Sequence, residues 1–143
     1  RGKIWLGMAP EFRIGSKVVP EILPLPRFAR NANVAVMNGL SGPFGLSVEF
    51  ETRATFGGRE YPSFSAVLAG YDKAARRYRP DYAYDPMTVP TFSYLDVVRG
   101  AVPSAKLRGK RVVIGAAHYQ SADFFLMPFS SEHIIPGAYF HVM

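Results

Sequence analysis

The sequence predicts a mixed α/β fold: a single domain in which a mixed β-sheet carries a β-hairpin and flanking helices. The chain has 143 residues, which is about the length of one domain, and 48% of them are hydrophobic and 20% charged, as in ordinary globular proteins. Short apolar runs alternate along the chain with segments of helical periodicity. This interleaved order is typical of helices packed against a mixed sheet.

The first part of the chain predicts two strands separated by irregular chain and one helix. Residues 3–8 form a short apolar run of strand type, whereas residues 10–20, with glycine, serine and two prolines, predict a loop. A short helix is expected from Pro26, because the first turn of a helix tolerates the missing donor of proline. A second strand is expected over residues 34–38.

Residues 46–61 predict the clearest hairpin, with Gly57 and Gly58 at its turn. Alternation with a period of two indicates an antiparallel pair with one face in water. We therefore interpret Glu49 and Glu51 as part of a solvated strand face and not as an acid/base pair. One face holds Val48, Phe50, Thr52, Ala54 and Phe56, and the other holds Glu49, Glu51, Arg53 and Thr55.

Two helices are expected after the hairpin. The first is amphipathic, opens at residues 61–63 and should end near Arg79, with Arg76 and Arg77 in a last turn where cations favour the helix dipole. Residues 81–92 contain prolines and predict extended, turn-rich chain. The second helix is expected over residues 94–99, with Thr91 or Ser93 as its cap and Gly100 as its end.

The run LRGKRVVIGAAHYQSAD, residues 107–123, predicts a basic turn followed by a strand buried on both faces. Ligands in open α/β sheets bind beyond the carboxyl ends of the strands. We therefore expect a ligand to bind just after Gly115, in the polar loop that also holds Gln120. The predicted ligand-binding residues are Ala116, His118, Tyr119, Ser121, Asp123 and His133.

No catalytic residue and no metal site is predicted. Ser121, His118 and Asp123 are residue types of a hydrolase, but they come from one loop, and no GxSxG motif is present. The set of His118, Asp123, His133 and His141 suits zinc by ligand type but lacks the spacing of a metal motif. Asp123 could also cap residues 124–129. A hydrolase-like or metal-dependent enzyme is the alternative function, and a ligand-free dimerisation domain is the second alternative.

Composition excludes several other classes. The chain has no cysteine, which excludes disulfides and thiol catalysis. The net charge is +6, but the basic residues are scattered along the chain, so nucleic acid is not an expected partner. Anionic lipid headgroups are kept as an alternative partner. No apolar run approaches the about 20 residues that span a bilayer, and no cofactor is expected. Both ends look cut, which predicts a piece of a longer protein.

Several motifs together resemble a known family. The run LRGKRVVIGA, followed by Asp123, Pro128, a proline-glycine pair at residues 136–137 and His141, is similar to the end of the second-type CHASE domain, the cyclase and histidine-kinase associated sensory extracellular domain. The LPLP segment near Leu23, the YPS at residues 61–63 and the TFSYLDVVRG at residues 91–100 follow the same layout. The chain departs from the family pattern at two places. PGAYFH has Tyr139 in place of an acidic residue, and before the hairpin, where the family commonly has two adjacent arginines, this chain has only Arg53 nearby.

The resemblance implies an extracytoplasmic, periplasmic sensory domain, excised from a bacterial inner-membrane receptor and lacking the upstream part of the family domain. It implies transmembrane helices and a cytoplasmic output domain in the same protein, such as an adenylate or guanylate cyclase, a diguanylate cyclase or phosphodiesterase, or a kinase. The chain itself is then not an enzyme. Its partner would be an unknown small molecule or a physical stimulus, and a homodimer is left open.

Overall fold

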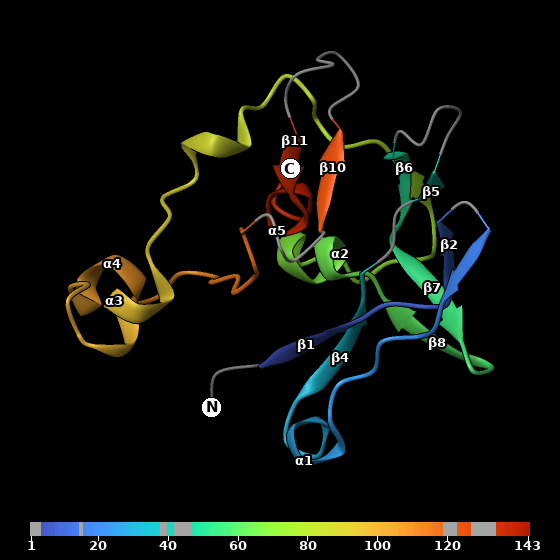
Figure 1. The fold of residues 1–143 in the computed structure, drawn as a ribbon, viewed down its shortest axis with the longest axis horizontal. Coiled ribbons are helices and arrows are strands. Elements are labelled where there is room, and N and C mark those ends of the chain that lie inside the picture. The colour runs from blue at the N-terminus through green and yellow to red at the C-terminus, as the bar shows by residue number, and fades with distance from the viewer. Residues whose placement is uncertain (1–3, 15, 38–39, 42–46, 119–122, 127–133) are drawn as a thin grey trace. The chain divides into compact units, whose positions relative to one another are not determined.

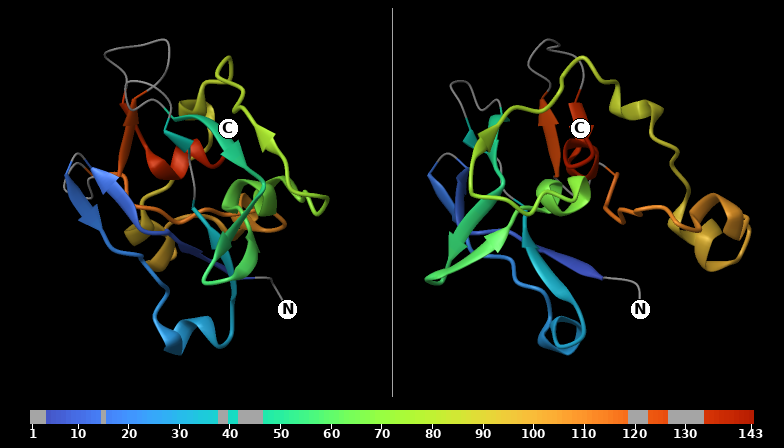
Figure 2. Two further views of the ribbon diagram at one scale, coloured as in Figure 1. Left: turned by 90° about the vertical axis from the view of Figure 1, so that its right-hand side faces the viewer. Right: turned by 180° about the vertical axis from the view of Figure 1, so that it is seen from behind.

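The computed structural model describes residues 4–14, 16–37, 40–41, 47–118, 123–126 and 134–143. The chain divides into two compact units, Arg1–Pro80 (unit 1) and Asp81–Met143 (unit 2). Each unit combines short strands with short helices, as Figure 1 and the two further views in Figure 2 show. The prediction of a mixed α/β fold is confirmed, with small two- and three-stranded sheets in place of one larger sheet.

Unit 1 begins with two parallel strands, β1 (Trp5–Met8) and β4 (Asn33–Val36), as expected from their apolar runs. The chain between them forms the helix α1 (Pro26–Ala29), which starts at the predicted proline. It also forms an antiparallel pair, β2 (Phe12–Ile14) and β3 (Lys17–Val19), so the expectation of a loop over residues 10–20 was wrong. The aromatic and β-branched residues of these strands favour extended pairing more strongly than the flanking prolines oppose it.

The predicted hairpin is present as β7 (Arg53–Phe56) paired with β8 (Arg59–Pro62). Gly57 and Gly58 have φ of 54° and 76°, the positive values that a two-residue hairpin turn needs at both central positions. The chain before it forms β6 (Ser47–Glu51), which pairs with β5 (Leu40–Ser41) on one side and β9 (Arg77–Tyr78) on the other.

The helix α2 (Phe64–Ala69) begins where the sequence predicts, because the Ser63 hydroxyl accepts a hydrogen bond from the Ala66 amide at 3.2 Å. It ends ten residues earlier than expected, since Gly70, at φ 69°, terminates the helix in the left-handed conformation. The prediction that Arg76, Arg77 and Arg79 lie in a last helical turn was therefore wrong. Arg77 lies in strand β9, and Arg76 and Arg79 flank that strand.

The core of unit 1 lies between its strands and α2. Ser63, which is 1% exposed, forms an isolated bridge with Val36 of β4 and so joins the start of the helix to the parallel pair. The Phe50 ring lies 5.8 Å from the Tyr78 ring across the β6–β9 pair. The buried hydrophobic residues of this unit are Met8, Ala35, Val36, Phe50 and Ala66.

Unit 2 has a small core around Phe140. Strands β10 (Phe124–Leu126) and β11 (Ile134–Pro136) pair in antiparallel fashion, and α5 (Gly137–Phe140) follows directly. The Phe125 and Tyr82 rings lie 4.9 and 6.5 Å from the Phe140 ring. The rest of the unit contains the 3-10 turn η2 (Pro86–Thr88) and the helices α3 (Tyr94–Val98) and α4 (Ser104–Leu107).

The predicted core strand after Leu107 is absent. Leu107 ends α4, and residues 110–117 form no regular element. Val112 and Ile114 are 55% and 76% exposed, so the apolar run is not buried on either face. A continuous apolar run indicates strand propensity but cannot reveal whether a partner strand is available, and no described strand pairs with this one.

Candidate functional site

The structure describes three of the six residues predicted to bind a ligand. Ala116 and His118 are exposed, and Asp123 directly precedes β10. Tyr119, Ser121 and His133 lie outside the described residues, as does the neighbouring Gln120. The ligand-binding role of this loop therefore stays a prediction.

Asp123 is held against the start of α5. Its backbone carbonyl accepts a hydrogen bond from the Gly137 amide at 2.9 Å. A Cβ atom at position 137 would lie only 2.5 and 2.6 Å from the two carboxylate oxygens of Asp123. Only glycine therefore fits at position 137 without displacing a neighbour. Residue 123 as a whole is exposed, but packing of the carboxyl group on α5 partly buries it and raises its pKa. Because Phe124–Leu126 is a strand, Asp123 does not cap a helix there.

Two further polar residues lie on or just after α5. Burial lowers the pKa of His141 from 6.5 to about 4, so its imidazole is neutral at neutral pH. The Tyr139 hydroxyl shares a hydrogen bond of 2.8 Å with the Thr91 hydroxyl. Tyr139 stands at the position of the family's acidic residue, and its contact here is a neutral hydrogen bond within unit 2.

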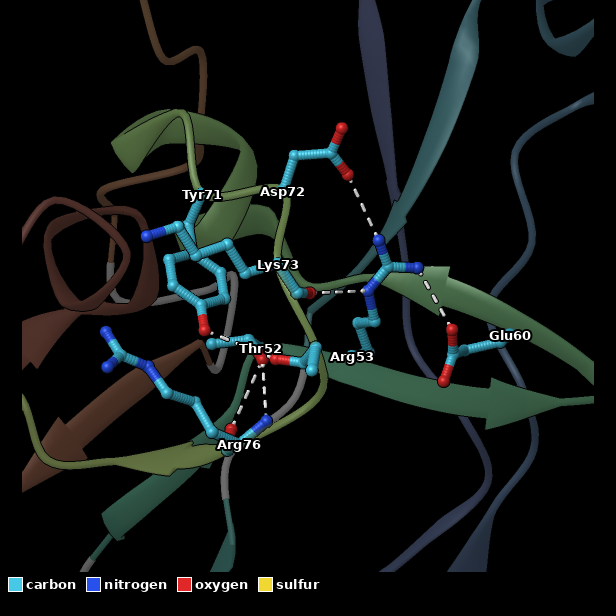
Figure 3. A network of polar contacts seen from close by, with 8 residues as sticks. Thr52, Arg53, Glu60, Tyr71, Asp72, Lys73 and Arg76 are labelled. Atoms are coloured by element: carbon cyan, nitrogen blue, oxygen red, sulfur yellow. Dashed lines mark hydrogen bonds and ion pairs between the residues drawn. The ribbon is translucent and has the colours of Figure 1, made fainter.

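A second polar site lies in unit 1 and is centred on Arg53 (Figure 3). The Arg53 guanidinium donates to Glu60 Oε2 at 3.0 Å, to Asp72 Oδ1 at 3.1 Å and to the Lys73 carbonyl at 3.3 Å. Glu60 lies on the paired strand β8, whereas Asp72 and Lys73 follow α2. One side chain thus joins the hairpin to the chain that leads into β9.

Thr52 makes a second connection to the same chain (Figure 3). Its hydroxyl accepts from the Arg76 amide at 3.0 Å and donates to the Arg76 carbonyl at 3.3 Å, and its own amide donates to that carbonyl at 2.9 Å. Thr52 is 4% exposed, so these bonds are shielded from water. The Arg76 guanidinium lies over the Tyr71 ring, 4.5 Å from its centroid.

Charged side chains continue along the β6–β9 pair beside this site. Arg77 Nε lies 3.2 Å from Glu51 Oε1, and Arg79 lies 3.5 Å from Glu49 Oε1. The interpretation of Glu49 and Glu51 as a solvated strand face is thus supported, with cross-strand arginines as partners. A cavity of about 400 Å³ opens between the two groups of ion pairs and is lined by Glu51, Arg53, Ala54, Thr55, Glu60, Ala75, Arg76 and Arg77.

Sequence reasoning missed this cavity because its walls come from two separate segments, residues 51–60 and residues 75–77. The available signal was the alternation of Glu49, Glu51 and Arg53 on one strand face with Arg77 and Arg79 at the same spacing further on. Those spacings match a cross-strand ladder of opposite charges. Because a helix was predicted over Arg77 and Arg79, these residues were not recognised as part of, or next to, a strand that pairs with β6.

The arrangement is suited to binding more than to catalysis. The cavity wall offers guanidinium and carboxylate groups of both signs, which can hydrogen-bond a polar ligand. The two carboxylates of the wall, Glu51 and Glu60, are each held in an ion pair with an arginine, Arg77 and Arg53. Among the residues that the structure describes, no group of three or more His, Asp or Glu side chains could hold a metal ion.

These features define a small α/β domain with an open polar cavity in unit 1. A family model described as "CHASE2 domain" matches residues 23–143, so the chain belongs to the CHASE2 family, as its motifs indicate. CHASE2 domains are extracellular sensory domains, which supports a sensory and non-catalytic role for this chain. No curated protein and no solved structure matches the chain. Within the described ranges, the helices are too short or too polar to cross a membrane.

Proposed function

We propose that this chain is the extracytoplasmic sensory domain of a bacterial transmembrane receptor and relays a stimulus to a cytoplasmic cyclase or kinase domain of the same protein. The observation that carries the proposal is the match of the CHASE2 family to residues 23–143. In this proposal the domain lies on the periplasmic side of the inner membrane, and membrane-spanning helices connect it to the output domain.

The cavity beside Arg53 supports a ligand as the stimulus. A sensor works when a ligand binds one conformation more tightly than another and shifts their populations. Here a charged ligand would compete with Glu60 for Arg53, the pair that joins β7 to β8, and with Glu51 for Arg77, the pair that joins β6 to β9. Releasing those pairs would loosen the hairpin. The loop from Ala116 to Asp123, with His133, is the second candidate position for the ligand.

Signalling by the full-length receptor tests the proposal. Arg53→Gln should reduce the response if the ligand binds the cavity, and Asp123→Ala should reduce it if the ligand binds the loop. Arg59→Gln is the matched control, because Arg59 lies on the same hairpin, stacks over the Tyr61 ring and takes part in none of the ion pairs among the described residues. If both test variants respond as the wild type does, neither position binds the stimulus. If replacing residues 23–143 leaves the response intact, the sensory role itself is wrong.

Activity assays and metal analysis distinguish the sensory proposal from the alternative that the chain is an enzyme. Purified protein should show no turnover in esterase and phosphatase screens and no stoichiometric metal in elemental analysis. A turnover abolished by His118→Ala or Asp123→Ala would replace the sensory proposal by a catalytic one.

A further inference from the structure

One long stretch of unit 2 contributes no fully buried residue to a core. Every residue from 91 to 118 is exposed or half-buried, and neither α3 nor α4 has a buried residue. The most exposed of its large apolar side chains is Ile114, at 76%. Contiguous apolar exposure of this kind marks an interaction surface. The exposed large apolar residues of the stretch are Phe92, Tyr94, Leu95, Val97, Val98, Val112 and Ile114.

The same stretch accounts for much of the net positive charge of the protein. Between residues 91 and 118 there are five lysines and arginines and one acidic residue, Asp96, which gives +4 of the chain's +6. The five cations are exposed: Arg99, Lys106, Arg108, Lys110 and Arg111. No ion pair in the described part of the chain involves any of the first four.

The local structure brings apolar and basic groups together. Val98 shares one side of α3 with Leu95 and Tyr94, because residues spaced by three and four positions lie close on a helix. Gly100, at φ 74°, ends α3, and α4 with its Lys106 then lies beside it (Figures 1 and 2). Gly109, at φ 73°, turns the chain again before Lys110. Tyrosine and aliphatic side chains next to a dense group of cations are typical of segments that bind at a membrane interface.

We propose that residues 94–114 form a surface that binds anionic lipid at the membrane. Charge complementarity favours this partner over a second copy of the chain, because pairing two such surfaces would bring +4 against +4. It also favours lipid over nucleic acid, since a phosphate backbone leaves Leu95, Val98 and Ile114 in water whereas a bilayer buries them. The inference goes beyond the sensory role and requires no stimulus or output domain.

Co-sedimentation of the purified chain with lipid vesicles tests this surface. Vesicles of phosphatidylcholine with about 30% phosphatidylglycerol should bind at least about tenfold more tightly than pure phosphatidylcholine, and binding should weaken as salt increases. The double variant Lys106→Gln/Lys110→Gln should lose several-fold in affinity for the anionic vesicles. Leu95→Ser/Val98→Ser, which keeps every charge, should also lose several-fold. Circular dichroism checks that both variants retain their fold.

The matched control is Arg27→Gln/Arg30→Gln, which removes the same charge from exposed positions of unit 1. An equal loss in this control, or no loss in Leu95→Ser/Val98→Ser, would mean that net charge alone attracts the protein, and the proposal is wrong. It is equally wrong if the chain does not bind anionic vesicles. Sedimentation velocity that then shows a dimer broken by Leu95→Ser/Val98→Ser would assign the surface to a second copy of the chain. Binding to duplex DNA as tight as to vesicles would overturn it as well. Failure here leaves the sensory proposal untouched, because that proposal is tested by signalling in the intact receptor.

Discussion

At the scale of single residues, the contact between Asp123 and Gly137 gives a direct test of packing. Adding a methyl group at position 137 would place it 2.5 Å from Asp123 Oδ1. Gly137→Ala should therefore lower the free energy of unfolding by about 1–2 kcal/mol, as overpacking of a tight site does. Urea denaturation of the purified protein measures the change.

A double-mutant cycle isolates the cause of that loss. With Asp123→Ala as background, the same Gly137→Ala change should cost much less, because the clashing carboxylate is gone. An unchanged cost would show that the glycine is needed for the backbone of α5 and not for the carboxylate.

His141 predicts how stability depends on pH. Its pKa is lowered from the ordinary 6.5 to about 4 in the folded protein. Between these pH values the imidazole is mostly protonated in the unfolded chain and mostly neutral in the folded chain. The contribution of this residue to the free energy of unfolding is fully present above pH 6.5. It is lost as the pH falls toward 4, and the loss is at most about 3 kcal/mol. The raised pKa of Asp123 acts in the opposite direction, since its folded form takes up a proton first on acidification.

Denaturation curves between neutral and acidic pH test this assignment. His141→Gln should flatten the loss of stability on acidification, whereas Asp123→Asn should steepen it. A loss of the same size in His141→Gln as in the wild type would assign the pH dependence to other groups.

At the scale of elements, Thr52 joins β6 to the chain that enters β9. Thr52→Val keeps the shape of the side chain but leaves the Arg76 amide without its hydroxyl acceptor. The expected cost is about 1–2 kcal/mol, because a shielded donor loses its partner. Thr55→Val makes the same chemical change at an exposed position and should cost less than about 0.5 kcal/mol. Similar losses in both variants would show that strand propensity and not the Arg76 bond is responsible.

Local signals predicted the elements that depend on local chemistry. The turn at Gly57 and Gly58, the opening of a helix at residues 61–63 and the helix start at Pro26 were all expected, because each follows from neighbouring residues. The strand expected after Leu107 and the helix expected to continue to Arg79 are absent, because the first depends on a partner strand and the second is ended by the left-handed Gly70. The Arg53 cavity depends on register between distant strands, which periodicity alone does not give.

At the scale of the whole molecule, the buried residues are unequally shared between the two units. Among the described residues, five of the seven buried hydrophobic side chains lie in unit 1, and Ile135 and Phe140 lie in unit 2. A unit that contains its own core can fold alone, although domains of this size are marginally stable. One domain was predicted from the chain length. Chain length does not indicate how the buried hydrophobic residues are divided between parts of the chain.

Unit 1 is therefore expected to fold without unit 2. A fragment of residues 1–80 should unfold cooperatively in urea, followed by the fluorescence of Trp5, the protein's single tryptophan, which lies in β1. Val36→Ala, at a position 1% exposed, should destabilise both the fragment and the full chain by about 2 kcal/mol, because it opens a cavity in a core that both contain. Ile135→Ala should leave the Trp5 transition of the full chain unchanged, since Ile135 belongs to the other unit. A fragment that shows no cooperative transition, or a Trp5 transition that shifts equally in Ile135→Ala, would show that the two cores form only together.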